Sequence, residues 1–80
     1  MTPPTLGQYL AGTSFNPSGD DKVASLKTKY AEIIDELNGL ITEDSTGQQK
    51  RHIAIAITEA QTAQMWAVKA ATLPKELGVQ

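Results

Sequence analysis

The chain has 80 residues, enough for one small domain, and a domain of this size is usually marginal without disulfides, a metal or partners. It has no cysteine and one histidine, which excludes disulfides, thiolate zinc sites, cysteine nucleophiles and histidine clusters. The net charge of −2 argues against general binding to DNA or RNA, which requires a basic surface. These exclusions leave oligomerisation as the expected source of stability.

Charge and hydropathy vary along the chain. Residues 1–44 carry three lysines against seven acids, whereas residues 45–80 carry four cations against two acids, so a local cationic site for a small anion is possible. No hydrophobic run approaches the ~18 residues of a membrane span. The N-terminus lacks the basic start and hydrophobic core of an export signal. We expect a soluble, cytoplasmic protein that binds neither membranes nor long nucleic acids.

The N-terminal arm, residues 1–19, is rich in residues that interrupt helices. Its three prolines and three glycines leave room for at most one helical turn, around Leu6–Ala11. The sequence then predicts a helix start, because Ser18 or Asp20 can cap and Asp21 adds negative charge at the positive end of the helix dipole.

A first long helix is predicted over residues 20–39. Its hydrophobic side chains recur at steps of 3 and 4, the spacing of an a/d seam that faces a partner helix. The seam consists of Val23, Leu26, Tyr30, Ile33, Leu37 and Leu40. Asn38 and Gly39 predict the stop, with a residue able to adopt the left-handed conformation. Acidic side chains such as Asp35 are expected on a solvated face.

A polar turn over residues 42–48 leads into a second helix, predicted over residues 48–72. One of its rows is almost entirely alanine: Ile53, Ala56, Ala60, Ala63, Ala67 and Ala70. A neighbouring row is bulkier: Ile55, Thr62, Trp66, Lys69 and Leu73. A helix that is hydrophobic on several sides requires several partners. The sequence therefore predicts an all-α fold, with one antiparallel helical hairpin domain over residues 1–80 that assembles as a homo-oligomer.

Catalysis is not expected from this sequence. It contains no GxSxG, Walker-type, HExxH or GxGxxG motif, and none of its carboxylates is paired with a histidine. His52, beside Arg51, is expected to be a capping or surface residue. We predict no catalytic residue, no metal site and no cofactor.

Several side chains have both an ordinary and a ligand-binding interpretation. Lys27 follows seam residue Leu26 and is either a snorkelling lysine at the edge of the seam or an anion ligand. Phe15, outside the seam, is either a plug over the core or a platform for a nucleobase. One stripe of the second helix is either a polar face or a set of cations and hydroxyls suited to phosphate and sugar. This stripe consists of Arg51, Thr58, Thr62, Met65 and Lys69.

Two segments resemble one known family. The run RHIAIAITEAQTAQMWAVKAA carries a pattern of Arg, Thr, Met and a basic residue at Arg51, Thr58, Met65 and Lys69. The run VASLKTKYAEIIDEL carries a hydrophobe–lysine step at Lys27. Together these segments are similar to small phage proteins that sponge cyclic oligonucleotides and so counter CBASS, a bacterial antiphage system. The resemblance covers about residues 15–72.

The resemblance implies a hexamer of helical hairpins, built from dimers, that binds signal nucleotides without cleaving them in the cytoplasm of the infected bacterium. Cyclic dinucleotides are expected between paired protomers, held by Lys27 with an aromatic residue, Phe15 or the more distant Tyr9, while Asn16 reads a base edge or fixes the loop. Cyclic trinucleotides are expected near the three-fold axis. The resemblance implies that Arg51, Thr58 and Lys69 form this site. At position 69, lysine replaces the arginine that is usual in the family.

Other functions remain compatible with the residues alone. A small helical adaptor or antitoxin-like protein would also present a hydrophobic helix, in that case to a host protein. A purely structural phage oligomer would do the same toward copies of itself. Neither alternative predicts binding of cyclic nucleotides.

Overall fold

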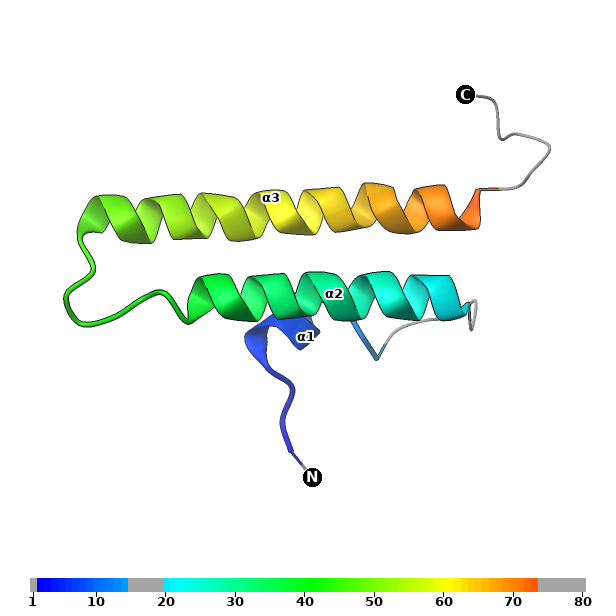
Figure 1. Cartoon of the computed structure of the whole chain (residues 1–80), viewed down its shortest axis with the longest axis horizontal. Helices are drawn as coiled ribbons and strands as arrows, with labels where there is room; N and C mark the ends of the chain where they lie inside the picture. Colours follow the sequence, from blue (N-terminus) through cyan, green and yellow to red (C-terminus); the bar gives the residue numbers. More distant parts are fainter. Residues whose placement is uncertain (1, 15–19, 74–80) are drawn as a thin grey trace.

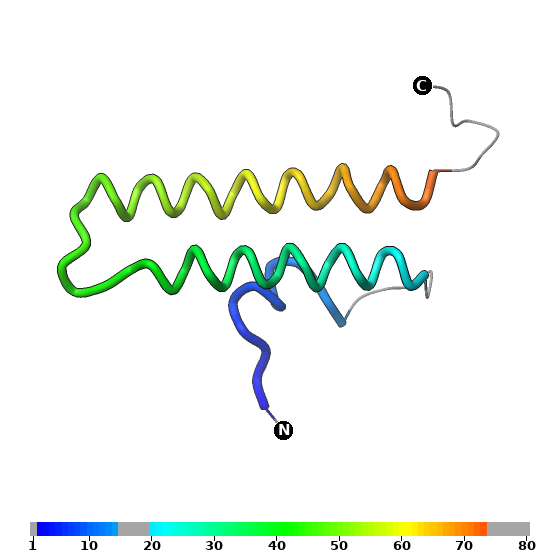
Figure 2. Tube along the Cα trace, viewed as in Figure 1, coloured from blue at the N-terminus to red at the C-terminus, as the bar shows by residue number. Residues whose placement is uncertain are grey.

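The computed structural model describes residues 2–14 and 20–73 and consists, over these ranges, of helices without strands. The helices are α1 (Leu6–Ala11), α2 (Asp21–Asn38) and α3 (Gly47–Thr72). The two long helices lie side by side and antiparallel, joined by residues 39–46, and α1 packs on α2 (Figures 1 and 2). The prediction of an all-helical hairpin is confirmed, and a helix lies at Leu6–Ala11 as predicted, although its six residues form more than the one turn expected.

Helix ends follow from local capping chemistry. Thr46 and Gln49 form a reciprocal capping box at the start of α3, with Gln49 N–H donating to Thr46 Oγ1 at 3.0 Å and Thr46 N–H to Gln49 Oε1 at 2.8 Å. Asp20, one of the two predicted caps, accepts the Lys22 N–H at 2.7 Å. The stop predicted at Asn38 and Gly39 is confirmed, but Gly39 has φ −70° and does not use the left-handed conformation that was open to it. Its N–H instead bonds the carbonyls of the last helical turn without leaving the right-handed region.

The predicted seam of α2 is displaced by one residue from the row that is buried. Val23 is buried as predicted, but the other buried positions are Lys27, Ala31 and Ile34, each directly after a predicted seam residue. Ile33 and Leu40 are exposed instead. The cause is α1, which covers one flank of α2 and rotates its buried side away from the seam that a two-helix hairpin would bury.

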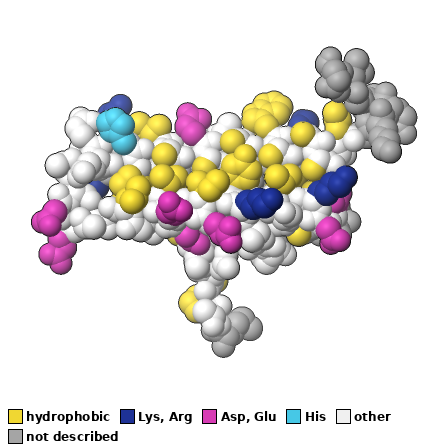
Figure 3. Space-filling view, viewed as in Figure 1, with side chains coloured by type: hydrophobic (Ala, Val, Ile, Leu, Met, Phe, Trp, Pro, Cys, Tyr) yellow, Lys and Arg dark blue, Asp and Glu magenta, His cyan; other side chains and the backbone are white. Residues whose placement is uncertain are grey.

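The hairpin has a thin core. Among the described residues only five hydrophobic side chains are buried. Of the large side chains in these ranges, only Ile34 is completely buried. The shortest dimension of the molecule is 12 Å, about the diameter of a single helix with its side chains. Figure 3 shows hydrophobic side chains gathered along the length of the molecule on the face turned to the viewer. One layer of helices therefore leaves much hydrophobic surface uncovered.

The alanine row of α3 is only partly covered by α2. Ala63 and Ala70 are exposed, whereas Gln64, which lies outside that row, is buried. The bulkier row is exposed, and Trp66 keeps 65% of its surface accessible. The chain alone thus leaves the outer side of α3 without a partner, consistent with a helix that is hydrophobic on more than one side.

Candidate functional site

The N-terminal end of α1 is fastened to α2 by one carboxylate. Asp35 accepts the Thr5 hydroxyl at Oδ2 and the Gly7 N–H at Oδ1, both at 2.7 Å. Thr5 also forms a capping box with Gln8. The expectation that Asp35 belongs to a solvated face is therefore wrong, because this carboxylate satisfies helix-start donors that have no partner within α1.

The same end of α1 approaches α2 very closely. A Cβ on Gly7 would overlap the carbonyl oxygen of Ala31 and lie 2.8 Å from Asp35 Oδ1. Glycine on α1 and alanine on α2 therefore allow the two backbones to meet. This contact lets a helix of six residues, too short to be stable by itself, hold one position.

The C-terminal end of α1 is held by side chains from both long helices. Gly12 adopts the left-handed conformation, with φ 67°, and its N–H and that of Thr13 bond carbonyls of the last turn. The Gln64 amide then donates to Ala11 O at 3.2 Å, and the Lys27 ammonium donates to Gly12 O at 3.3 Å. Carbonyls that would lack partners at the end of α1 are thus bonded by α3 and α2.

Lys27 differs from its prediction. It was expected at the edge of the seam, but only 8% of its surface is exposed, so its stem is part of the core and its ammonium reaches the end of α1. The adjoining turn lines a surface hollow of about 490 Å³ that includes Tyr9, Gly12 and Ser14. Tyr9 is 74% exposed on this side of α1.

The structure brings part of the predicted dinucleotide set together. Lys27 is bonded to Gly12, and Gly12 shares the hollow with Tyr9, so an ammonium and an exposed aromatic ring flank the same turn. Phe15 and Asn16, the other two members of the set, lie outside the described residues. The arrangement offers a positive charge and a stacking surface within one small region.

The predicted trinucleotide residues are separated along α3. Arg51 and Thr58 line one hollow of about 380 Å³. Lys69 lines a second, of about 110 Å³, with Met65 and Trp66, and its ammonium lies 5.8 Å from the centroid of the Trp66 ring. Eleven residues of helix, about 16 Å, separate Thr58 from Lys69. One chain therefore does not gather these three side chains around one point.

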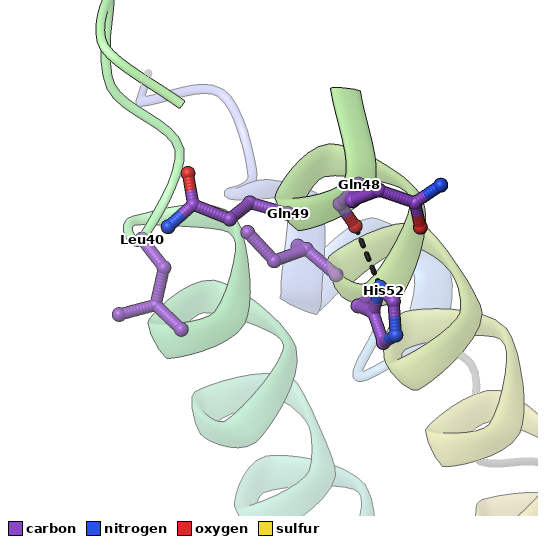
Figure 4. A pocket seen from close by; sticks show the side chains of 5 residues that line it. Leu40, Gln48, Gln49 and His52 are labelled. Atoms are coloured by element: carbon purple, nitrogen blue, oxygen red, sulfur yellow. Dashed lines mark hydrogen bonds between the residues drawn. The ribbon is translucent and has the colours of Figure 1, made fainter. Parts of the chain in front are cut away.

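A further hollow, of about 480 Å³, lies where the connecting segment enters α3 (Figure 4). Leu40, Gln48, Gln49 and Ile53 line it with His52, whose Nδ1 lies 2.6 Å from Gln48 O, one helical turn away. His52 is exposed, in agreement with its expected place at the surface.

The described ranges contain neither a metal-binding cluster nor a membrane-spanning helix. Within residues 2–14 and 20–73, no group of three or more His, Cys, Asp or Glu side chains is placed to hold a metal ion. Over the same ranges, no helix has both the length and the hydrophobicity needed to cross a membrane.

Sequence reasoning missed two side chains that shape this region, Asp35 and Gln64. Their contacts span 28 and 53 residues of chain, a separation that periodicity within one helix does not report. One signal was present: Thr5 and Gln8 match the T-x-x-Q form of the capping box, which marks α1 as a defined helix whose ends need partners.

One of three comparisons with known proteins gives a match. No curated protein and no solved structure gives a significant match. The family model described as "Acb2/Tad1, hairpin domain" matches residues 9–72, a range that includes the second half of α1 and all of α2 and α3. The chain therefore belongs to the Acb2/Tad1 hairpin-domain family, the anti-CBASS sponges that sequester cyclic oligonucleotides.

Proposed function

We propose that this protein captures cyclic dinucleotides beside the C-terminal turn of α1 and cyclic trinucleotides on the outer side of α3, and that it releases both uncleaved. The family match over residues 9–72 carries the proposal, because it spans both regions. Capture lowers the concentration of free signal in the infected cell, and CBASS effectors then stay inactive.

The dinucleotide site is built around Lys27. A cyclic dinucleotide carries two phosphates, two flat bases and approximate two-fold symmetry, so two protomers related by a two-fold axis can each supply one ammonium and one aromatic ring. Tyr9 is the described aromatic residue beside the turn that Lys27 holds. Phe15 and Asn16 remain proposed ligand residues on the basis of the sequence. Each aromatic stack contributes about 1–3 kcal/mol.

The trinucleotide site requires more than one chain. Arg51 and Thr58 lie about 16 Å or more from Lys69 along α3, so a compact ligand reaches all three only where different protomers meet. Exposed Trp66 and Met65 beside Lys69 supply the hydrophobic surface for such a contact. This favours a homohexamer built from dimers, with α3 at the subunit interfaces.

The assembly has a direct test. Light scattering at micromolar concentration should give about six times the 8.6 kDa chain mass, and Trp66→Glu should lower it while circular dichroism stays helical. Gln48→Glu, which also introduces a glutamate but at an exposed position on the first turn of α3, is the control and should keep the wild-type mass. A wild-type mass near 8.6 kDa would contradict the oligomer.

Binding is tested by a thermal-shift screen against cyclic di- and trinucleotides, followed by calorimetry. We expect an increase in melting temperature with at least one cyclic dinucleotide, and none with the linear dinucleotide or with a 20-nucleotide RNA. An unchanged melting temperature across all cyclic ligands would rule the proposal out and favour the adaptor alternative.

Release of intact ligand separates a sponge from a nuclease. Hydrolysis of a phosphodiester needs a metal or a positioned base with an activated nucleophile. We expect chromatography of the ligand recovered from a heat-denatured complex to give the cyclic form alone. Linear product in that fraction would mean that the protein is an enzyme.

A further inference from the structure

We infer that Asp35 and Gln64 are positioning residues of the dinucleotide site, which fix the two ends of α1 and thereby fix the turn that Lys27 and Tyr9 flank. The inference rests on the proposed binding of dinucleotides at this turn. It assigns a role in affinity to two side chains that lie on different helices and that need not touch the ligand.

The first observation is the way α1 is anchored. A six-residue helix has too few internal hydrogen bonds to be stable alone, so its position depends on contacts at its ends. Asp35 bonds the N-terminal end twice, through the Thr5 hydroxyl and the Gly7 N–H. Gln64 bonds the C-terminal end, through Ala11 O, and is only 7% exposed.

The second observation is the spacing of the anchors along α2. Lys27 and Asp35 are eight residues apart, about 12 Å, while the six residues of α1 span about 9 Å. The two side chains therefore reach opposite ends of α1, and α1 runs antiparallel to α2 between them. If the contacts at one end of α1 are lost, the helix can rotate about the end that is still bonded.

The third observation concerns the partner of the Lys27 ammonium. It donates to Gly12 O, and the Gln64 amide donates to the preceding carbonyl, Ala11 O. These adjacent carbonyls belong to one turn, which closes through the left-handed conformation of Gly12. Displacement of the turn therefore displaces the ammonium relative to Tyr9, and a ligand that needs both groups is bound less tightly.

Two variants test the inference on the full-length protein, with cyclic GMP–AMP, cyclic di-GMP and cyclic di-AMP as probes. Asp35→Leu removes both bonds at one end, and Gln64→Met removes the donor at the other while keeping the length of the side chain. We expect each to weaken binding of the preferred dinucleotide at least tenfold by calorimetry, with circular dichroism and oligomer mass unchanged. Amide hydrogen exchange of Gly12 and Thr13 should become faster in both.

Matched controls exclude a general effect of the substitutions. Glu36→Leu, at an exposed position next to Asp35, and Gln61→Met, one turn before Gln64, should bind within twofold of the wild type. Asp35→Asn keeps a carbonyl oxygen for the Gly7 N–H and should restore most of the affinity lost in Asp35→Leu. That rescue is not expected if the carboxylate acts only by its charge.

The outcomes separate the inference from the function on which it rests. If the wild type binds a dinucleotide and both Asp35→Leu and Gln64→Met bind within twofold of it, the inference is overturned and the binding function stands. It is also overturned if Asp35→Asn binds as weakly as Asp35→Leu. If the wild type binds none of the three probes, the dinucleotide function itself fails, and the inference falls with it.

Discussion

The two regions proposed to bind nucleotides differ in how far a single chain completes them. At the end of α1, hydrogen bonds from α2 and α3 fix the turn beside Lys27 within one protomer. On the outer side of α3, Arg51 and Lys69 lie apart, and Trp66 and Met65 are exposed. The fold of one chain therefore preorganises the first region, whereas the proposed trinucleotide site requires side chains from more than one protomer.

This difference explains where polar and hydrophobic side chains are used. Asp35, Gln64 and Lys27 bond backbone groups at the ends of α1, where an unbonded buried group would cost about 1–3 kcal/mol. The outer side of α3 instead keeps large hydrophobic side chains accessible, as surfaces that bind partners do. Variants in one region should therefore leave the other intact.

The largest effect is expected from Lys27→Met. It removes the charge but keeps much of the buried stem, and each lost charge-assisted hydrogen bond costs about 1.5–3 kcal/mol. With two copies per ligand, binding of dinucleotides should fall below detection in calorimetry. Lys29→Met, at an exposed position of the same helix, is the control and should bind normally. Unchanged affinity in Lys27→Met would remove this residue from the site.

Because Lys27 is buried, its substitution also has a structural cost. Loss of the bond to Gly12 O should lower the free energy of unfolding by about 1–3 kcal/mol, which urea unfolding measures. The sequence-based expectation that Lys27 only flanks the core predicted no such cost. Lys27→Met is therefore a cleaner test than Lys27→Ala, which would also leave a cavity.

The converse variant is Arg51→Ala. Loss of one charge-assisted bond should weaken trinucleotide binding about tenfold or more, at about 1.5–3 kcal/mol, and leave dinucleotide affinity unchanged. Calorimetry with both ligand classes on one preparation measures the two effects together. Equal losses for both ligands would show that the two regions are one site or are coupled through the assembly.

A smaller effect is expected from Gly7→Ala, which acts on α1 alone. The added Cβ overlaps the Ala31 carbonyl, so α1 must move, and overpacking of this kind costs about 1–3 kcal/mol. Gly47→Ala is the matched control, since a Cβ there meets nothing within 4 Å, and it should stabilise α3 by about 0.4–1 kcal/mol. Urea unfolding should give a lower free energy of unfolding for Gly7→Ala and a higher one for Gly47→Ala than for the wild type. If both change stability equally, the close approach of α1 and α2 is wrong.

The smallest effect is expected from Lys69→Arg. The guanidinium keeps the charge and adds a planar pair of donors that can bind one phosphate twice, so trinucleotide affinity should rise a few-fold. Arginine also stacks on aromatic rings, so the contact with Trp66 is preserved. Lys50→Arg, at another exposed position on α3, should change nothing. A loss of trinucleotide affinity in Lys69→Arg would argue against phosphate binding at this position.

Local sequence patterns determined the helices themselves. Hydrophobic steps of 3 and 4, Asp20 at the start of α2 and the polar turn before α3 led to bounds within one residue of α2 and α3. The glycines around Leu6–Ala11 limited α1 to one short helix, as found. These features depend on neighbours within about one helical turn, which a sequence displays directly.

Only the tertiary structure decided which side of each helix is buried. The predicted hydrophobic seam assumed that α2 packs against one helix only. Because α1 also packs on α2, the buried row contains Lys27 and Ala31 and not Leu26 and Tyr30. Asp35 and Gln64 bond the two ends of α1, a helix that is distant from both in the sequence. The physical reason is that α1 meets α2 through Gly7 and Ala31, which are too small to belong to a pattern of large hydrophobic residues. The contact that selects the buried side of α2 therefore cannot be predicted from that pattern.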